Sequence, residues 1–165
     1  MPVREALEEC AGSASAVRPL LLKLPPENSE ELCWTESTLE ALLSPFIARG
    51  VCDGVVAVNS SIRLARKLLP PQLPDLPGGI SGRPLRDVGL EVVSMARKVL
   101  GPEALVIGCG GIADATDAQA FRRSGADLLE VYTAVIYRGP AVIAEIARAC
   151  TAHGTKLEPL GSGRR

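Results

Sequence analysis

Ala104-Leu105-Val106-Ile107-Gly108-Cys109-Gly110-Gly111 is the stretch of sequence that decides the fold. A short apolar run leads directly into a glycine-rich loop, after which Asp114 can cap a helix that extends to Arg123. An uninterrupted apolar run is typical of a strand that is buried on both faces. Glycines at the end of such a strand let backbone N–H groups approach phosphate oxygens closely. The stretch therefore predicts a strand, a ligand-binding turn and a helix within a parallel sheet.

The same strand–turn–helix pattern occurs three more times. The other apolar runs cover residues 20–24, 54–58 and 128–132, and each ends in loop-forming residues. Alternating strands and helices indicate a parallel sheet with right-handed crossovers, either an open doubly wound sheet or part of a (β/α)8 barrel. Eight βα units need about 250 residues, so in a barrel four units would amount to half, over residues 1–154. We expect residues 155–165 to form a disordered tail.

Helical segments are predicted between these runs. Asn28-Ser29 can cap a helix that runs toward Arg49, with a break at Pro45. A partial helix is predicted over about residues 3–11. A further helix would bury one face, made of Val88, Val92, Met95, Ala96 and Val99. The last helix would run from Pro140 to Gly154, with a buried stripe of Ile143, Ile146, Ala147 and Cys150. The Pro- and Leu-rich segment 64–79 shows no period, which predicts a long functional loop.

Composition narrows the classes of function. The 165 residues include 18 basic and 19 acidic side chains, a balance that gives no basic stripe for binding nucleic acid. The five cysteines are scattered and His153 is the single histidine, so no metal site is expected. No signal peptide is recognisable and no apolar run is long enough to cross a membrane. These features suit reduced thiols in the cytoplasm.

Glycine-rich turns mark a candidate phosphate site. In (β/α) barrels, functional residues lie at the C-terminal ends of strands, and phosphate is often bound by the loops after the last two strands. Gly111 follows the third apolar run and Tyr132-Thr133 ends the fourth, so we expect these residues to form one phosphate cradle. Gly82 lies in a second glycine-dense loop over residues 78–85 that also permits close approach of a ligand. An ordinary strand-to-helix turn is the alternative for the G-x-G-G motif.

Polar side chains interrupt or follow the first two apolar runs. Lys23 lies in an otherwise apolar strand, where its ammonium group needs a polar partner and can stabilise negative charge on a cofactor. A strand-end lysine that extends to solvent is the alternative. Asn59 and Ser60 follow the second run and suit the recognition of amide and carboxylate groups, with a helix cap or an Asx turn as the alternative.

Five blocks of this sequence share their order with one known family of enzymes. The blocks are Leu22-Lys23-Leu24-Pro25-Pro26, Val58-Asn59-Ser60-Ser61, Gly78-Gly79-Ile80-Ser81-Gly82-Arg83-Pro84-Leu85-Arg86-Asp87, Gly108-Cys109-Gly110-Gly111-Ile112 and Val131-Tyr132-Thr133-Ala134. They resemble the C-terminal half of the dihydroorotate dehydrogenase family over about residues 18–153. The resemblance is to the quinone-using, membrane-associated class more than to the soluble classes.

The resemblance implies a flavoenzyme of pyrimidine (UMP) biosynthesis in which dihydroorotate gives a hydride to FMN at the mouth of the barrel. It implies that Asn59 and Ser60 hold the dihydroorotate or orotate, and it places the chain in the last four βα units. The residues that it assigns to FMN are Lys23 at the flavin ring, Val58 through its backbone, and Gly82, Gly111, Tyr132 and Thr133 at the phosphate and ribityl chain.

Some features of the family have no counterpart in this sequence. The catalytic serine base, the first four strands and the quinone tunnel are missing, so no catalytic residue is assigned here. We therefore expect a truncated quinone-dependent enzyme with little activity alone, in the cytoplasm or at the cytoplasmic face of the inner membrane. Self-association or an N-terminal half-barrel partner would cover the unpaired strand edges. The alternatives are another FMN barrel oxidoreductase and a non-catalytic half-barrel that binds FMN or phosphate.

Overall fold

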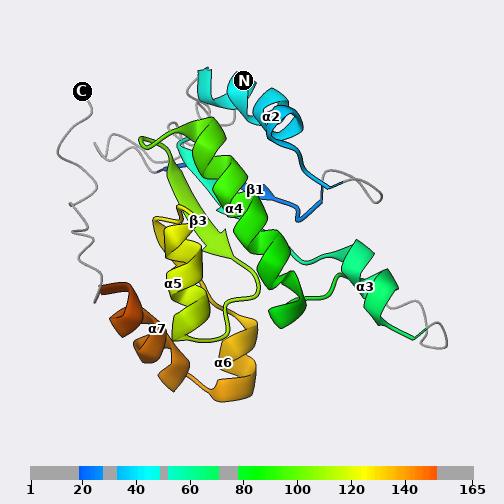
Figure 1. Ribbon diagram of the computed structural model, residues 1–165, viewed down its shortest axis with the longest axis vertical. Coiled ribbons are helices and arrows are strands. Elements are labelled where there is room, and N and C mark those ends of the chain that lie inside the picture. The colour runs from blue at the N-terminus through cyan, green and yellow to red at the C-terminus, as the bar shows by residue number, and fades with distance from the viewer. Residues whose placement is uncertain (1–18, 28–32, 49–51, 71–77, 152–165) are drawn as a thin grey trace, which may run out of the picture.

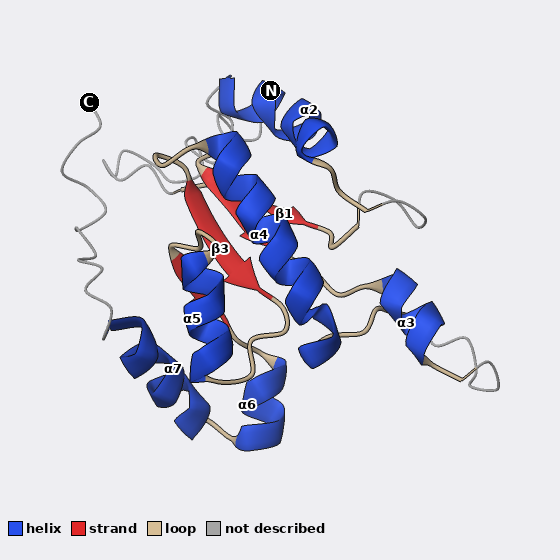
Figure 2. Cartoon of the chain, viewed as in Figure 1, coloured by secondary structure: helices blue, strands red, loops and turns tan. Residues whose placement is uncertain are grey.

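A single parallel sheet of four strands forms the centre of the molecule (Figure 2). The computed structural model describes residues 19–27, 33–48, 52–70 and 78–151. Neighbouring strands pair in parallel in the order β1-β2-β3-β4, which confirms the predicted sheet. The strands are β1 (Leu21–Leu24), β2 (Gly54–Ala57), β3 (Leu105–Cys109) and β4 (Leu128–Glu130).

Helices follow every strand in the described residues. The helix predicted over about residues 3–11 and the tail predicted over 155–165 lie outside these residues. The helices are α2 (Glu36–Ala48), α3 (Ile62–Leu68), the short 3₁₀ helix η1 (Arg83–Leu85), α4 (Arg86–Leu100), α5 (Ala115–Arg123), α6 (Thr133–Arg138) and α7 (Ala141–Thr151).

The strand order distinguishes the two architectures that the sequence left open. A doubly wound sheet reverses its strand order at a switch point, and its helices cover both faces. Here the strands follow one another in chain order without a reversal, so right-handed crossovers place their helices on the same face. Figure 1 shows α4 and α5 side by side across one face of the sheet. The fold is therefore part of a (β/α)8 barrel, as predicted.

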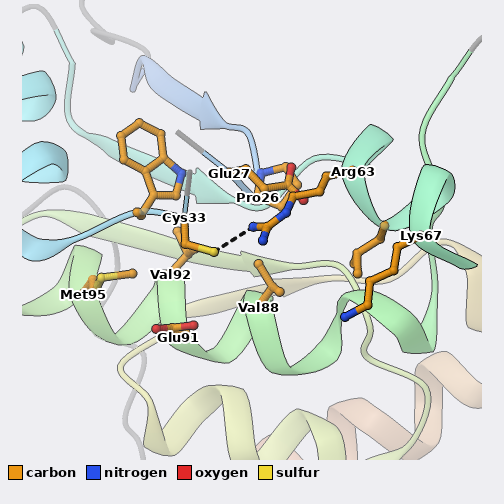
Figure 3. Close-up of a pocket in the computed structure, with 11 residues that line it drawn as sticks. Pro26, Glu27, Cys33, Arg63, Lys67, Val88, Glu91, Val92 and Met95 are labelled. Carbon is orange, nitrogen blue, oxygen red and sulfur yellow. Dashed lines mark hydrogen bonds between the residues drawn. The ribbon is translucent and has the colours of Figure 1, made fainter. Parts of the chain in front are cut away.

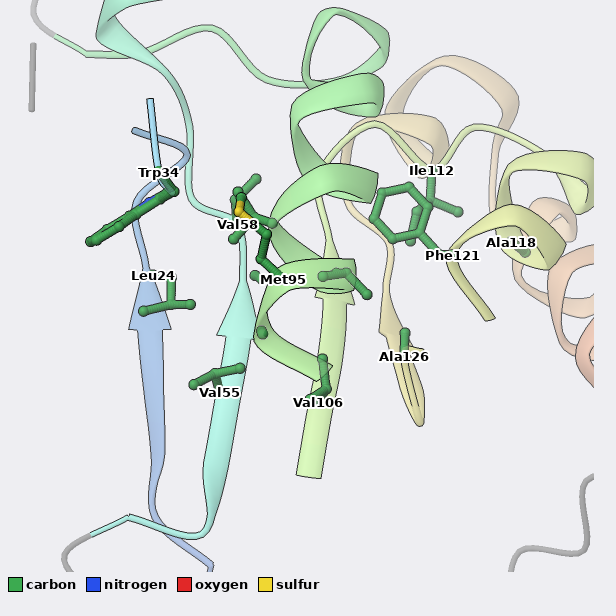
Figure 4. Packing of buried hydrophobic residues seen from close by; sticks show 14 of the residues in the cluster. Leu24, Trp34, Val55, Val58, Met95, Val106, Ile112, Ala118, Phe121 and Ala126 are labelled. Carbon is green, nitrogen blue, oxygen red and sulfur yellow. The ribbon is translucent and has the colours of Figure 1, made fainter. Parts of the chain in front are cut away.

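The core lies between the sheet and α4. Leu24, Val55 and Val106 are fully buried on the helix-covered side of three adjacent strands (Figure 4). On α4, Val92 and Ala96 are also buried within the same hydrophobic cluster, which confirms the apolar face predicted for this helix. Burial of one such aliphatic side chain contributes about 1.5–3 kcal/mol to the free energy of folding. The packing of this layer therefore holds the strands in place against α4.

Local capping explains where two helices begin. The Asp114 carboxylate accepts hydrogen bonds of 3.0 Å from the amides of Thr116 and Asp117, so it caps α5 as predicted. The prediction for α2 was wrong, because residues 33–35 are not helical and the Thr35 hydroxyl, at 3.3 Å from the Thr38 amide, marks the start. The predicted cap Asn28-Ser29 lies outside the described residues.

Three further expectations need correction. Pro45 lies inside α2 without breaking it, and the helix continues for three more residues to Ala48. The segment predicted as a long loop begins with α3, although residues 71–77 are not described. In α7, Val142 and Ile146 are buried, whereas Ile143 is 53% exposed. The reason is that only α5 and α6 pack closely against this helix in the described part of the chain. Ala147 is exposed as well, so the buried stripe is narrower than predicted.

Arg97 joins the segments that precede β3 and β4. Its guanidinium group donates hydrogen bonds to the carbonyl oxygens of Gly125 (3.0 Å), Gly101 (2.6 Å) and Ala104 (2.9 Å), and it pairs with the Asp127 carboxylate. That carboxylate also accepts a 2.8 Å hydrogen bond from the β3 amide of Val106. One side chain thus ties α4 to the N-terminal ends of two strands.

We expect Arg97→Met to lower the free energy of unfolding by about 2–3 kcal/mol, because three carbonyl groups and a carboxylate lose their shared donor. Urea denaturation of the variant and the parent chain measures this change. Lys98→Met is the matched control, since Lys98 is exposed and makes only a surface ion pair with Glu36. Its loss should change stability by less than about 1 kcal/mol. Equal effects of the two substitutions would contradict the bridging role of Arg97.

Candidate functional site

A cavity of about 400 Å³ lies at the C-terminal ends of the four strands. Its lining comes from Lys23 in β1, from the ends of β3 and β4, from the segments that follow β2, β3 and β4, and from the glycine-dense loop before η1. Every residue that the sequence suggested for a ligand site lines this one cavity: Lys23, Val58, Asn59, Ser60, Gly82, Gly111, Tyr132 and Thr133. The structure therefore brings together residues that are up to 110 positions apart in the sequence.

The parallel register explains why the loops after β1, β2 and β3 meet. Leu24 pairs with Ala57, and Ala57 pairs with Gly108, so the three strands end at the same edge. Beyond the strands, the Val58 amide donates a 2.6 Å hydrogen bond to the Cys109 carbonyl, and the Asn59 amide donates a 2.9 Å bond to the Leu24 carbonyl. The Ala57–Val58 peptide bond is cis. These bonds hold the Asn59-Ser60 turn between its two neighbours.

The glycine-dense loop crosses from the end of β2 to the end of β4. Ser61 and Ile80 exchange backbone hydrogen bonds of 3.0 and 2.9 Å, which fix one end of the loop. At the other end, the Ser81 and Thr133 hydroxyl oxygens lie 3.1 Å apart. A Cβ on Gly82 would lie 2.9 Å from the Thr133 methyl group, so a larger residue at position 82 would push the two segments apart.

Gly111 allows the loop after β3 to lie against the start of α4. Its φ is +84°, and a Cβ there would lie 2.4 Å from the backbone N and Cα of Arg86. Within the described residues, the amides of Gly110, Gly111, Tyr132 and Thr133 donate no hydrogen bond to the protein. Such amides at the rim of a cavity are suited to an anionic group.

Lys23 carries the one positive side chain among the described residues that line the cavity. Its Nζ lies 3.0 Å from Oε2 of Glu130, and Cys109 lies beside the pair. Partial burial lowers the pKa of Lys23, but the hydrogen bond to Glu130 and the nearby Cys109 outweigh it, so the net shift is upward. Burial raises the pKa of the Cys109 thiol, against the opposing effect of Lys23. The lysine therefore stays positively charged at neutral pH.

The contact between Lys23 and Glu130 also reports on the shape of the sheet. Their strands, β1 and β4, are separated by three strand spacings, or about 14 Å in a flat sheet. Side chains stand roughly perpendicular to a sheet, so this contact requires the sheet to be concave on the side away from the helices. Sequence reasoning missed Glu130, although it interrupts the fourth apolar run just as Lys23 interrupts the first.

The two arginines that directly follow the cavity residues Gly82 and Leu85 serve the framework. Arg83 pairs with Asp114 at 2.9 Å, and Arg86 pairs with the buried Asp117 at 2.5 Å. The hydrogen bond from the Asp117 amide, followed by the charge of Arg83, holds the pKa of Asp114 below its usual value, so this pair stays ionised at neutral pH. The cavity can therefore attract anions through Lys23 and backbone amides rather than through arginine.

A second, smaller cavity of about 220 Å³ lies between Trp34, α3 and α4 (Figure 3). Arg63 crosses it and donates a 2.8 Å hydrogen bond to the Cys33 sulfur. Its charged rim contains both signs, and its volume is below the range of about 300–1,000 Å³ that is common for ligand sites. The cavity at the strand ends is therefore the better candidate site.

The described ranges hold neither a metal cluster nor a membrane-spanning helix. No group of three or more histidine, cysteine, aspartate or glutamate side chains in them could hold a metal ion. None of the helices in these ranges is both long and apolar enough to cross a membrane.

The fold and the cavity define the class of protein: part of a parallel (β/α) barrel with a cavity at the C-terminal ends of the strands. A family model described as dihydroorotate dehydrogenase matches residues 3–152, and the chain belongs to this family. This confirms the resemblance on which the site residues were chosen.

Curated relatives and solved structures agree with this assignment. The chain is 41% identical over 132 residues to the dihydroorotate dehydrogenase (quinone) of Paraburkholderia phymatum, a match that covers 79% of this chain and 36% of the relative. It is 34% identical over 148 residues to the enzyme of the same name from Delftia acidovorans, covering 89% and 40%. The dihydroorotate dehydrogenase of Eimeria tenella, solved with ferulenol, superposes with a TM-score of 0.65 at 29% identity, covering 85% of this chain and 35% of that one. The chain thus spans well under half the length of these proteins.

Gly111→Ala should destabilise the chain by about 2–4 kcal/mol, because it adds a clash with the Arg86 backbone to the strain of a positive φ. Gly139→Ala is the matched control, since Gly139 has a φ of +75° and an added Cβ there would meet no atom within 4 Å. With ψ at 175°, position 139 lies in a region that is essentially restricted to glycine, so that control should cost about 1–3 kcal/mol of backbone strain without any clash. Thermal and urea unfolding give both values, and a Gly111 variant no less stable than the Gly139 variant would argue against the close contact.

Proposed function

We propose that this chain forms the FMN- and substrate-binding part of a quinone-dependent dihydroorotate dehydrogenase, which oxidises dihydroorotate to orotate in pyrimidine biosynthesis. One observation carries the proposal: the residues that the family resemblance assigns to FMN and orotate line a single cavity. Family membership and the names of the curated relatives support the reaction and the quinone acceptor. Use of a quinone would bring the working protein to a membrane surface.

The cavity fits FMN in size and in its donor groups. Its volume of about 400 Å³ lies in the range of small-molecule sites. Amides near Gly111 and Thr133, together with the Thr133 and Ser81 hydroxyl groups, suit a phosphate group, with Gly82 and Tyr132 beside them. Lys23 and the Val58 backbone would contact the flavin ring. When bound, FMN supplies the acceptor for a hydride.

Asn59 and Ser60 are the proposed substrate contacts. Both are exposed at the cavity, and Oδ1 of Asn59 accepts a 2.9 Å hydrogen bond from the Ser60 amide. This bond leaves the NH₂ group of Asn59 to donate to a carbonyl or carboxylate oxygen of the substrate. The Ser60 hydroxyl can donate a second hydrogen bond.

The general base belongs, in this proposal, to the part of the family's barrel that this chain does not match. The resemblance carries no base residue onto the sequence, and the relatives are more than twice as long as the matched segment. A complementary half-barrel, or a second copy, would also cover the outer edges of β1 and β4, which pair with no further strand in the described residues. A half-barrel that binds FMN without catalysis is the second candidate, and the absence of an assigned base favours it.

Titration of FMN with the purified chain, monitored through the flavin fluorescence, tests the cofactor proposal. Lys23→Met should weaken binding about tenfold, because it removes the positive side chain from the cavity, and a tenfold change corresponds to about 1.4 kcal/mol. Lys67→Met is the matched control, since Lys67 lines the smaller cavity and should leave the affinity unchanged. Absence of FMN binding to the parent chain would refute the proposal.

Anaerobic mixing of the FMN-loaded chain with dihydroorotate tests the catalytic part. Without a positioned base, the rate of flavin reduction should be about 10²–10⁴-fold lower than in an enzyme with a general base in place. Orotate should still perturb the flavin absorbance, and Asn59→Ala should weaken that response while FMN affinity is retained. Robust turnover by the chain alone would show that it carries its own base, and would remove the non-catalytic alternative.

A further inference from the structure

Glu130 occupies a place in the cavity that neither the sequence motifs nor the proposed cofactor contacts explain. It is the last residue of β4, and its carboxylate lies 3.0 Å from the Lys23 ammonium. The two side chains are 40% and 49% exposed, so both remain accessible to a ligand in the cavity. A charged residue at this place in an apolar strand suggests a role at the cavity itself.

The sheet brings this pair together from its two outer strands, next to a cysteine on a third. Cys109 and Glu130 are register partners on β3 and β4, and Lys23 approaches them from β1 across the concave face. The cavity segments between them contribute no further charge: Asn59 and Ser60 follow β2, and the loop before η1 contributes Gly79, Ser81 and Gly82. Glu130 is therefore the only negative side chain among the described residues that line the cavity.

We propose that Glu130 is a positioning residue for Lys23, which holds the ammonium group at the cavity and offsets part of its charge. An anionic ligand then meets an ion pair, in which Lys23 attracts it and Glu130 opposes it, instead of a free cation. The inference rests on the proposed function, because FMN is the ligand on which this effect would act.

Electrostatics gives the direction of the effect. The carboxylate opposes negative charge on any group that contacts Lys23, and solvent moderates this opposition because both side chains of the pair are partly exposed. Reduction adds electrons to bound FMN, so a nearby carboxylate makes reduction less favourable. Glu130 should therefore weaken FMN binding and lower the midpoint potential of bound FMN, while it keeps Lys23 in place.

Glu130→Gln tests the inference, because it removes the charge and retains the size of the side chain. The pKa of Lys23, measured without FMN by NMR of ¹³C-methylated lysines, should fall when its charged partner is lost. The FMN dissociation constant should fall about tenfold. The equilibrium constant for flavin reduction should rise about tenfold, or about 30 mV for a two-electron couple.

Glu40→Gln is the matched control, since Glu40 is an exposed residue of α2 outside the cavity. It removes the same charge and should change none of the three quantities. An unchanged Lys23 pKa in Glu130→Gln would overturn the inference, as would an unchanged potential and affinity in a chain that binds FMN. A parent chain that fails to bind FMN would refute the proposed function, and the Lys23 pKa would then decide separately whether Glu130 holds the ammonium group.

Discussion

The parallel register of the four strands is the constraint on which the site depends. It brings four chain segments to one edge, and there the Val58 and Asn59 amides bond to the ends of the neighbouring strands. A shift of one residue in a strand would move each of its side chains to the opposite face. Lys23 would then lie beneath the helices, where its charge would be buried without a partner, and the cavity would lose its cation.

Sequence reasoning succeeded where the signals were local. Continuous apolar runs located the strands, Asp114 located the start of α5, and glycines and polar residues at strand ends located the cavity. It failed where distant segments decide the outcome. The partner of Lys23 lies 107 residues away, and the exposed side of α7 depends on which helices cover it. No pattern within a short window contains that information.

The charges around the cavity divide into two groups with different tasks. Arg83 pairs with Asp114 and Arg86 pairs with Asp117, and these two ion pairs join η1 and the start of α4 to the start of α5. These pairs shape the walls and leave the cavity with Lys23 and Glu130 as its own charged side chains in the described structure. Recognition of an anion at the strand ends therefore relies on the directions of backbone N–H groups, which depend on the fold rather than on flexible side chains.

The hydrogen bonds of Arg97 join segments that precede β3 and β4, whereas the cavity residues lie at or beyond the C-terminal ends of the strands. The groups that secure the barrel and the groups that meet the ligand are thus separated by the full length of the strands. Exposed side chains at the ligand edge, such as Asn59 and Ser60, can change which compound is recognised at little cost to the framework, whereas Gly111 packs against the Arg86 backbone and cannot be changed freely. This separation makes the half-barrel a suitable starting point for directed evolution, in which the exposed cavity side chains are randomised while Gly111 and the Arg97 edge are left intact.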